Sequence, residues 1–494
     1  MPLTANTTTI KVSPTALNPT YNETIVVLES TNVAQENFQW VIEIWVDGLP
    51  NGLNTTLIST LVILPNPEGF GVIDVQRHIE NYITTTFQPA DLDTIGTAED
   101  SYRIWSLNVT EYFDNYVWTF DRHNTSGGKI VFINNTEDHF FEVGDEVNIA
   151  QTPVPTYPAY DGETTVFGIT SPDSITIDKA GTTVLNEPGV ATGNKTVEIS
   201  QILASANLYK SFNGVIDFAD FNSFNLSIYD MDLSNPTALF LTDIPNNYEL
   251  SRTDPLWLNG YTDSLSYNTM NILTDNGEFL ITPISPVPPV NDTYILQSKV
   301  GYADLIDTTS GVVVISGALP IVDPSTTFIN VFASNGGTAI SETKSFTVVD
   351  KCSKYENIKL FFLDRLGSYI PLNFDRVNRT NVTNERSNYK QNYGNYDSVA
   401  NAWGYTTHAR GTTTYDIKST KSITCTSDWL NDEQVELMHI LLTSPDVYYI
   451  DEAGVYRAIT ITTNSFEEKK RVNDKLLNYT ITFEYANNNG NQRG

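Results

Sequence analysis

The chain has 494 residues, of which 40% are hydrophobic and 18% are charged, and its formal net charge is −31. This length is more than one compact domain needs, and the apolar content is too high for a disordered chain. A surface this acidic repels a phosphate backbone, which excludes nucleic-acid binding as the main role. Because charged residues are scarce, Asn, Thr and Ser must supply much of the polar surface, which favours strands and turns.

Export and membrane signals are not apparent in the sequence. Residues 1–6 contain neither a basic start nor an apolar run, and nowhere do eighteen apolar residues follow one another. We therefore expect a protein that is made in the cytoplasm of its host cell and has no membrane span. The two cysteines, Cys352 and Cys425, are too few for a disulfide-stapled scaffold. A bridge between them and two separate apolar thiols both remain open.

The first part of the chain has the pattern of a β-rich domain. From Phe38 and Trp40 to Val46, every second residue is apolar, which is typical of a strand with one buried face. Behind Asp74, a suitable N-cap, apolar residues recur at helical spacing and predict a short helix that ends near Ile83. Further strands are expected at residues 61–64, 103–107, 116–120, 212–229, 239–241 and 256–258.

Residues 128–200 have a different texture, with short strands separated by turns. This spacing predicts a small closed barrel. The run from Phe140 to Ile149, which contains a Gly-Asp turn, is similar to the opening of SH3-like barrels. We interpret the barrel as an insertion in an N-terminal domain that comprises residues 1–127 and 201–285. The barrel strands are expected at 129–133, 140–149, 163–169 and 174–177.

The proline-rich stretch 282–289 predicts a stiff linker and the clearest domain boundary in the chain. Behind it, apolar runs between Gly and Pro turns predict a small β-sandwich over residues 290–350. A sheet that joins the two ends of the molecule is the alternative for this segment.

Residues 351–494 are expected to form a C-terminal α+β docking domain. Its helix is predicted over 431–443, where Val435, Met438, Leu441 and Leu442 lie on one stripe and a proline follows the end. The expected strands are 358–363, 369–374, 415–423, 447–450, 456–462 and 476–483.

The sequence contains no motif that assigns catalysis, a cofactor or a metal. Asp230-x-Asp232-x-Ser234 begins like a calcium loop, but the residues that follow lack the Gly and the Glu that such a loop needs. Residues 341–344 match a nucleophile motif without its companion motifs and are interpreted as strand surface, and residues 335–337 as a hairpin turn. Metal-ligand spacing is also absent among the five histidines, His78, His123, His139, His408 and His439. We therefore predict a non-enzymatic protein with no catalytic, cofactor-binding or metal-binding residues.

The seven Trp and 26 Tyr residues are expected to fill cores and subunit interfaces, with sugar-stacking platforms as the alternative.

Three stretches resemble structural proteins of tailed phages that infect Bacteroidetes, including flavobacterial and crAss-like phages. The first stretch is LPNPEGFGVIDV at residues 64–75, and the second is ALFLTDIP at residues 238–245. The third starts with LFFLDRLGSY at residues 360–369 and continues through WLNDE, LTSPDVY and NDKLLNYT, the last ending at Thr480. The resemblance covers about two thirds of the chain, without the barrel, and implies a component of the virion tail.

The resemblance implies a subunit of a ring, hub or baseplate that assembles with its own copies and with neighbouring tail proteins. A glycan-binding tail adhesin or receptor-binding protein, which would contact a host surface glycan, is the alternative, followed by a polysaccharide hydrolase. Within this picture the barrel is expected to face outward. The C-terminal domain, with its basic run at residues 469–471, is expected to dock the subunit to its neighbours.

Overall fold

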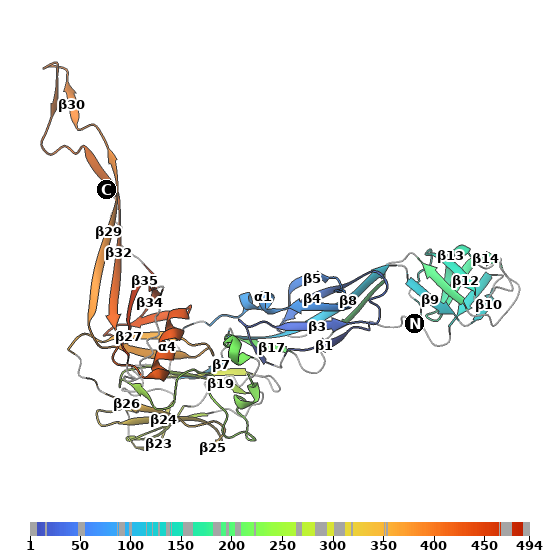
Figure 1. Ribbon diagram of the computed structural model, residues 1–494, viewed down its shortest axis with the longest axis horizontal. Helices are drawn as coiled ribbons and strands as arrows, with labels where there is room; N and C mark the ends of the chain where they lie inside the picture. The colour runs from blue at the N-terminus through green and yellow to red at the C-terminus, as the bar shows by residue number, and fades with distance from the viewer. Residues whose placement is uncertain are drawn as a thin grey trace. The chain divides into compact units, whose positions relative to one another are not determined.

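The computed structural model is mainly β and divides into two compact units (Figure 1). Unit 1 comprises Met1–Thr84 and Tyr102–Val215, and unit 2 comprises Thr85–Ser101 and Ile216–Gly494. The structure describes residues 7–14, 17–47, 55–85, 87, 94–97, 101–114, 116–120, 122–126, 129–134, 139, 141–151, 162–180, 189–193, 197–202, 209–221, 224–262, 269–281, 294–300, 312–317, 320–349, 351, 354–463, 465 and 477–487.

Unit 1 contains a small sheet and a larger sheet that share one hydrophobic core. The small sheet has the order β1-β3-β6, and the larger one β2-β17-β8-β4-β5 with β16 paired to β8. Their bounds are β1 Thr9–Val12, β2 Leu17–Pro19, β3 Ile25–Glu29, β4 Glu36–Val46, β5 Thr56–Ile63, β6 Phe70–Asp74, β8 Tyr102–Asp114, β16 Val197–Ile202 and β17 Tyr209–Phe212.

Strand β4 confirms the alternation expected around residues 38–46. Its alternate residues Phe38, Trp40, Ile42, Ile44 and Val46 are all buried, whereas Val41 and Trp45 on the other face are only partly buried. The Trp40 indole donates a hydrogen bond to the Thr8 hydroxyl (2.9 Å). On β6, a Cβ atom at Gly71 would lie 2.9 Å from the Trp40 ring, so only glycine leaves room for the indole there.

The predicted helix after Asp74 is shorter than expected. It consists of α1 (Gln76–Ile79) and the 3-10 turn η1 (Glu80–Tyr82). The Asp74 carboxylate accepts hydrogen bonds from the Gln76 N–H (3.1 Å) and from the Thr24 N–H (3.2 Å). The N-cap of α1 is Val75, which makes no side-chain capping hydrogen bond, so the prediction of Asp74 as the N-cap is wrong. Asp74 lies one residue earlier and links the helix start to Thr24, the residue before β3.

A seven-stranded sheet forms the inserted barrel. Strands β9 and β10 follow one another in the chain but lie at opposite ends of the order β10-β11-β14-β13-β12-β15-β9, so the sheet is nearly closed on itself. The chain enters from β8 and leaves into β16, and these two strands pair with each other. The barrel strands thus lie between β8 and β16 in the chain and run from Tyr116 to Gly193, whereas residues 128–200 were expected. Their bounds are β9 Tyr116–Phe120, β10 Arg122–Ser126, β11 Lys129–Ile133, β12 Glu146–Gln151, β13 Gly162–Ser171, β14 Ser174–Ala180 and β15 Gly189–Gly193.

Unit 2 contains a seven-stranded sheet, a ten-stranded sheet and a two-stranded hairpin. The seven-stranded sheet has the order β18-β26-β24-β20-β21-β23, with β25 paired to β24. Its bounds are β18 Tyr248–Leu250, β20 Thr269–Thr274, β21 Gly277–Ile281, β23 Val312–Gly317, β24 Phe328–Asn335, β25 Thr338–Ala339 and β26 Lys344–Val348. Between β24 and β25, Gly336 and Gly337 have positive φ angles, which confirms the predicted hairpin turn.

The ten-stranded sheet has the order β29-β32-β35-β34-β33-β27-β28-β19-β22-β7. Strands at 358–363, 369–374 and 447–450 occur as predicted. The bounds are β7 Thr94–Thr97, β19 Leu256–Thr262, β22 Tyr294–Val300, β27 Ile358–Leu363, β28 Tyr369–Phe374, β29 Asn378–Lys390, β32 Thr412–Thr426, β33 Val447–Ile450, β34 Tyr456–Ile461 and β35 Thr480–Tyr485.

Strand pairing crosses the predicted domain boundaries. The linker residues 282–289 lie outside the described part of the chain, but β21 before them pairs with β23 after them, and β19 pairs with β22. Residues 201–285 and 290–350 are thus not separate sheets. A proline-rich linker fixes only local stiffness and does not determine which strands pair across it.

The segment 212–229, predicted as a strand, differs in a similar way. After β17 it contains the short helical turns α2 (Phe218–Phe221) and η4 (Leu226–Ile228). Its aromatic residues are therefore not presented by a strand.

Helix α4 (Asp432–Thr443) confirms the predicted C-terminal helix. Asn431 accepts a hydrogen bond from the Gln434 N–H (2.8 Å), and the Gln434 side chain accepts one from the Asn431 N–H (3.1 Å). This reciprocal capping box fixes the helix start. Within the described part of 351–494, the α+β character rests on this one helix. None of the helices in the described ranges has the length and apolarity that a membrane crossing requires.

Candidate functional site

Unit 2 carries a long β-hairpin, here called the arm, which comprises residues 378–426. Strands β29 and β32 pair over thirteen residue pairs, from Asn378↔Cys425 to Lys390↔Thr412. Only Ser422–Thr426 of β32 also pair with β35, so the rest of the hairpin extends as a two-stranded ribbon (orange in Figure 1). Every residue of β29 after Asn378 is exposed. An isolated two-stranded ribbon is marginally stable in water, which makes a covering partner physically favourable.

The register divides the arm into two chemically different faces. Directly opposed residues of an antiparallel pair lie on the same face, so Val382 shares a face with Lys421, and Arg386 shares that face with Ile417. We call this the basic face. At its base the same face continues into Ile423 and Cys425, which are buried in the body of unit 2.

The opposite face, here called the threonine face, is electrically neutral and more polar. It carries the pairs Arg379↔Thr424, Asn381↔Ser422, Thr383↔Thr420, Glu385↔Lys418 and Ser387↔Asp416.

The charge of the arm differs in sign from that of the chain. Its formal charge is +3, whereas the whole chain carries −31, which leaves −34 for all other residues. The six positive residues are Arg379, Arg386, Lys390, Arg410, Lys418 and Lys421, and the three negative ones are Glu385, Asp397 and Asp416.

The end of the arm is a small hairpin of β30 (Gly394–Asp397) and β31 (Ala402–Tyr405). The pairs Gly394↔Tyr405 and Tyr396↔Trp403 place three aromatic side chains on one face. Trp403 is 60% exposed and Tyr405 70% exposed. The indole of Trp403 covers Gly394 so closely that a Cβ atom there would overlap it. An open groove of about 810 Å³ adjoins this aromatic face.

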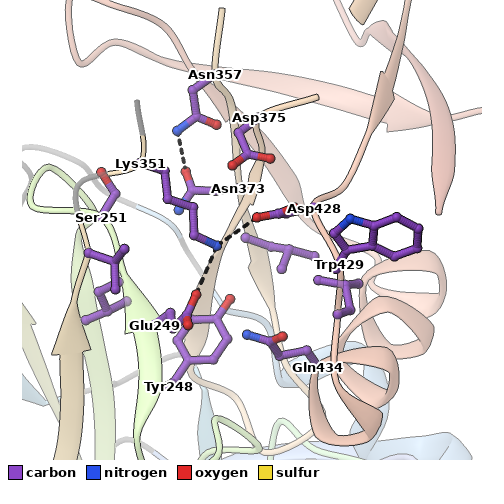
Figure 2. A pocket seen from close by; sticks show the side chains of 14 residues that line it. Tyr248, Glu249, Ser251, Lys351, Asn357, Asn373, Asp375, Asp428, Trp429 and Gln434 are labelled. Carbon is purple, nitrogen blue, oxygen red and sulfur yellow. Dashed lines mark hydrogen bonds and ion pairs between the residues drawn. The ribbon is translucent and has the colours of Figure 1, made fainter. Parts of the chain in front are cut away.

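A network of charges holds the root of the arm (Figure 2). Arg376 precedes β29 and donates two hydrogen bonds to Oδ1 of Asp428, which follows β32 (3.0 and 2.6 Å). Lys351 bridges Asp428 Oδ2 (3.1 Å) and Glu249 Oε2 of β18 (2.9 Å). The two ends of the hairpin are thus tied to each other and to the seven-stranded sheet.

Burial and hydrogen bonding oppose each other at Asp428. Partial burial favours the neutral acid, but hydrogen bonds from Arg376, the Trp429 N–H and Lys351 outweigh it, so the pKa of Asp428 is lowered. At the neighbouring Asp375, desolvation and the Asp428 charge raise the pKa instead. Because its pKa is lowered, Asp428 is negatively charged at neutral pH and can hold both cations of the root.

The cavity at the root has a volume of about 100 Å³. Ligand pockets for small molecules usually enclose 300–1,000 Å³. Since its central cation is already engaged by two carboxylates, the cavity has the character of a structural joint rather than of a substrate site.

No family model matches this chain, and no curated protein sequence is significantly similar to it.

A second charged cluster surrounds the loop between β27 and β28, at residues 364–368. Both oxygens of the buried Asp364 accept hydrogen bonds, with the Leu366 and Ser368 N–H groups as donors to one of them (2.9 and 2.8 Å). Burial, followed by the nearby charge of Asp243, raises the pKa of Asp364 to about 8. Arg365 is ion-paired with Asp243 (3.1 Å). The other oxygen of Asp364 accepts hydrogen bonds from the Thr242 hydroxyl (2.8 Å) and the Asp243 N–H (3.0 Å). These contacts shape a tight loop and tie it to the segment at residues 242–243.

The motifs considered in the sequence have structural roles where they are described. Ser341 accepts a hydrogen bond from the Ala333 N–H (2.8 Å) and is buried, as is Lys344, so the prediction of exposed strand surface is wrong for these two residues. Asp232 accepts hydrogen bonds from the Leu233 N–H and the Ser234 hydroxyl and closes a turn.

The histidines do not share one site. His139 is buried next to the Trp118 ring, whereas His78, His408 and His439 belong to α1, the arm and α4, respectively. His123 belongs to β10.

Many aromatic residues fill cores, while others are exposed, in the arm and elsewhere, such as Phe167 and Trp429. Trp40, Trp105, Trp118 and Trp257 are fully buried, as the core interpretation predicts. Cys425 is a free, buried thiol, and burial raises its pKa. Cys352 and the basic run at residues 469–471 lie outside the described residues.

Sequence reasoning missed the arm as a functional element. Residues 415–423 were expected to form a strand, but β29, β30 and β31 were not predicted. The signal in the sequence is the reversal of charge over residues 378–426, together with five aromatic residues between Tyr389 and Tyr405.

Proposed function

We propose that this protein is a structural subunit of a phage virion tail, in a ring, hub or baseplate, and that the arm mediates its assembly. The observation that carries the proposal is the arm itself, a two-stranded ribbon with exposed faces and a charge opposite to that of the chain. A ribbon of this kind gains stability when a neighbouring surface covers it. The resemblance of residues 64–75, 238–245 and 360–369 to phage structural proteins supports a place in the virion tail.

A structural role agrees with the chemistry of the described clusters. The charges of Lys351 and Arg365 are engaged by carboxylates that hold the fold together. In our proposal the protein is therefore not an enzyme, and its partners are other copies in a closed ring and adjacent tail proteins. Incubation of the purified protein with host surface polysaccharide should release no new reducing ends.

An arm-deleted variant tests the proposal in the particle. Replacing residues 381–422 by an Asn-Gly turn keeps the pairs from Asn378↔Cys425 to Thr380↔Ile423, which belong to the body of the sheet. A phage that carries only this variant should yield particles without the subunit or without complete tails in electron micrographs. The control variant replaces the barrel, residues 116–193, by a tight turn between β8 and β16, and its particles should assemble.

Imaging of the intact virion provides the direct readout. We expect density for several identical copies around the tail axis. A single isolated copy, or mass spectra of purified virions that lack this chain, would contradict the proposal.

A glycan-binding adhesin is the second candidate, and the tip of the arm favours it. Tyr396, Trp403 and Tyr405 form an exposed aromatic face beside an open groove that also contains Asn395 and Arg410. Sugar rings stack on such faces while amides and guanidinium groups bind their hydroxyls. Adsorption of the purified protein to host cells, lost in Trp403→Ala, would support this candidate.

A further inference from the structure

We infer that the arm binds the acidic body of a second copy of this chain through its basic face. This inference rests on the proposed role in assembly and names the partner. It commits to one surface, defined by Val382, Arg386, Ile417 and Lys421.

The arm and the rest of the chain have charges of opposite sign. Two arms, each with a formal charge of +3, repel one another, whereas the rest of a second copy carries −34. Attraction between unlike charges steers the arm of one copy toward the body of another. Such a contact joins two different surfaces and is therefore heterologous, which is the kind of interface that builds rings.

The two faces of the arm differ in charge and in apolar content. Between Asn378 and Ser387, and opposite them on β32, the basic face carries two cations and no acid, whereas the threonine face carries two cations and two acids. Only the basic face combines cations with the branched apolar side chains Val382 and Ile417. Apolar burial at the centre and cations that meet acids at the rim are typical of a specific protein interface.

The basic face continues at its base into a surface that the chain itself buries. At its base, Ile423 and Cys425 lie on the same face and are buried in the body of unit 2. Val382, one step further out, is 54% exposed. The chain's own body covers the basic face at its base. The body of a second copy would cover the same face further along the shaft.

Self-association of the purified full-length protein tests the inference. Sedimentation at increasing protein concentration should show oligomers that weaken between 0.05 and about 0.5 M NaCl, because salt screens the charges. The double variant Arg386→Glu/Lys421→Glu reverses two charges on the basic face and should raise the dissociation constant at least about tenfold.

A matched control has the same change of charge on the other face. Arg379→Glu/Lys418→Glu also changes the arm by −4 and should alter the dissociation constant less than about threefold. Equal weakening by both variants would overturn the assignment to the basic face. No weakening by the first variant would overturn the role of charge.

A photo-crosslinking pair identifies the partner and does not depend on the affinity in dilute solution. Benzoylphenylalanine in place of Val382 should form crosslinks to the acidic body of another copy, and in place of Thr383 it should not. Crosslinks between two arms, or from Val382 only within its own chain, would refute the inference.

The outcomes separate this inference from the proposed function. The inference fails if the protein in virions crosslinks from position 382 only to a different tail protein. It also fails if the protein with benzoylphenylalanine at position 382 binds host glycan and forms no crosslink to another copy. In both cases imaging of the virion decides the assembly role. If copies associate through the basic face but the chain is absent from virions, the tail assignment fails while the inference stands.

Discussion

The root of the arm depends on one carboxylate, and removal of its charge should loosen the arm without unfolding the protein. In Asp428→Asn the side chain keeps its size but loses its attraction for Arg376 and Lys351. The Asp428 side chain is 22% exposed and Lys351 is 42% exposed, so this pair contributes roughly 0.2–1 kcal/mol. A loss of about 1 kcal/mol corresponds to roughly a fivefold higher population of the open root.

Amide hydrogen exchange is the appropriate assay, because it measures local opening. The first pairs of the ladder, from Asn378↔Cys425 outward, should exchange about fivefold faster in Asp428→Asn, while β27 and β28 should be unaffected. Glu385→Gln, a change of the same kind on the exposed shaft, is the control and should leave the root unchanged.

The pH dependence of the root follows from the lowered pKa of Asp428. A carboxyl group whose pKa is lower in the folded state stabilises that state fully above its ordinary value, which is about 3.9. This stabilisation is lost as the pH falls through the lowered value. Protection of the root should therefore be constant above about pH 5 and should decrease only below about pH 4. Equal exchange in the wild type and in Asp428→Asn at neutral pH would refute the reasoning.

Three further changes test the cores and the arm. In a Cys352→Ser background, Cys425 should not react with a disulfide reagent until the protein is unfolded, because its thiol is buried and its pKa is raised; rapid reaction in the folded protein would contradict this. Gly71→Ala should destabilise unit 1 by about 1–3 kcal/mol in denaturant titrations, since its Cβ would press on Trp40; no loss would show that the core yields. Trp403→Ala should leave the unfolding midpoint unchanged, whereas Trp40→Ala should cost about 3–5 kcal/mol, and similar losses in both would contradict the exposed placement of Trp403.

Local pattern alone predicted several elements. The alternation around Trp40 specifies β4, because a strand with one buried face needs an apolar residue at every second position. The capping residues Asn431 and Gln434 and the apolar stripe behind them specify α4. Short strands with frequent turns predicted the barrel. For β4 and α4 the information lies within about fifteen residues of sequence.

Tertiary structure decided the partners of the strands and the faces of the arm. Every strand offers the same backbone hydrogen-bonding groups, so the sequence did not indicate that β19 and β22 would join the sheet of β28 across a predicted boundary. Strand β29 has no apolar alternation, because neither of its faces is buried along the shaft. The basic face arises only when Val382 is paired with Lys421, and that register depends on hydrogen bonds between segments about forty residues apart.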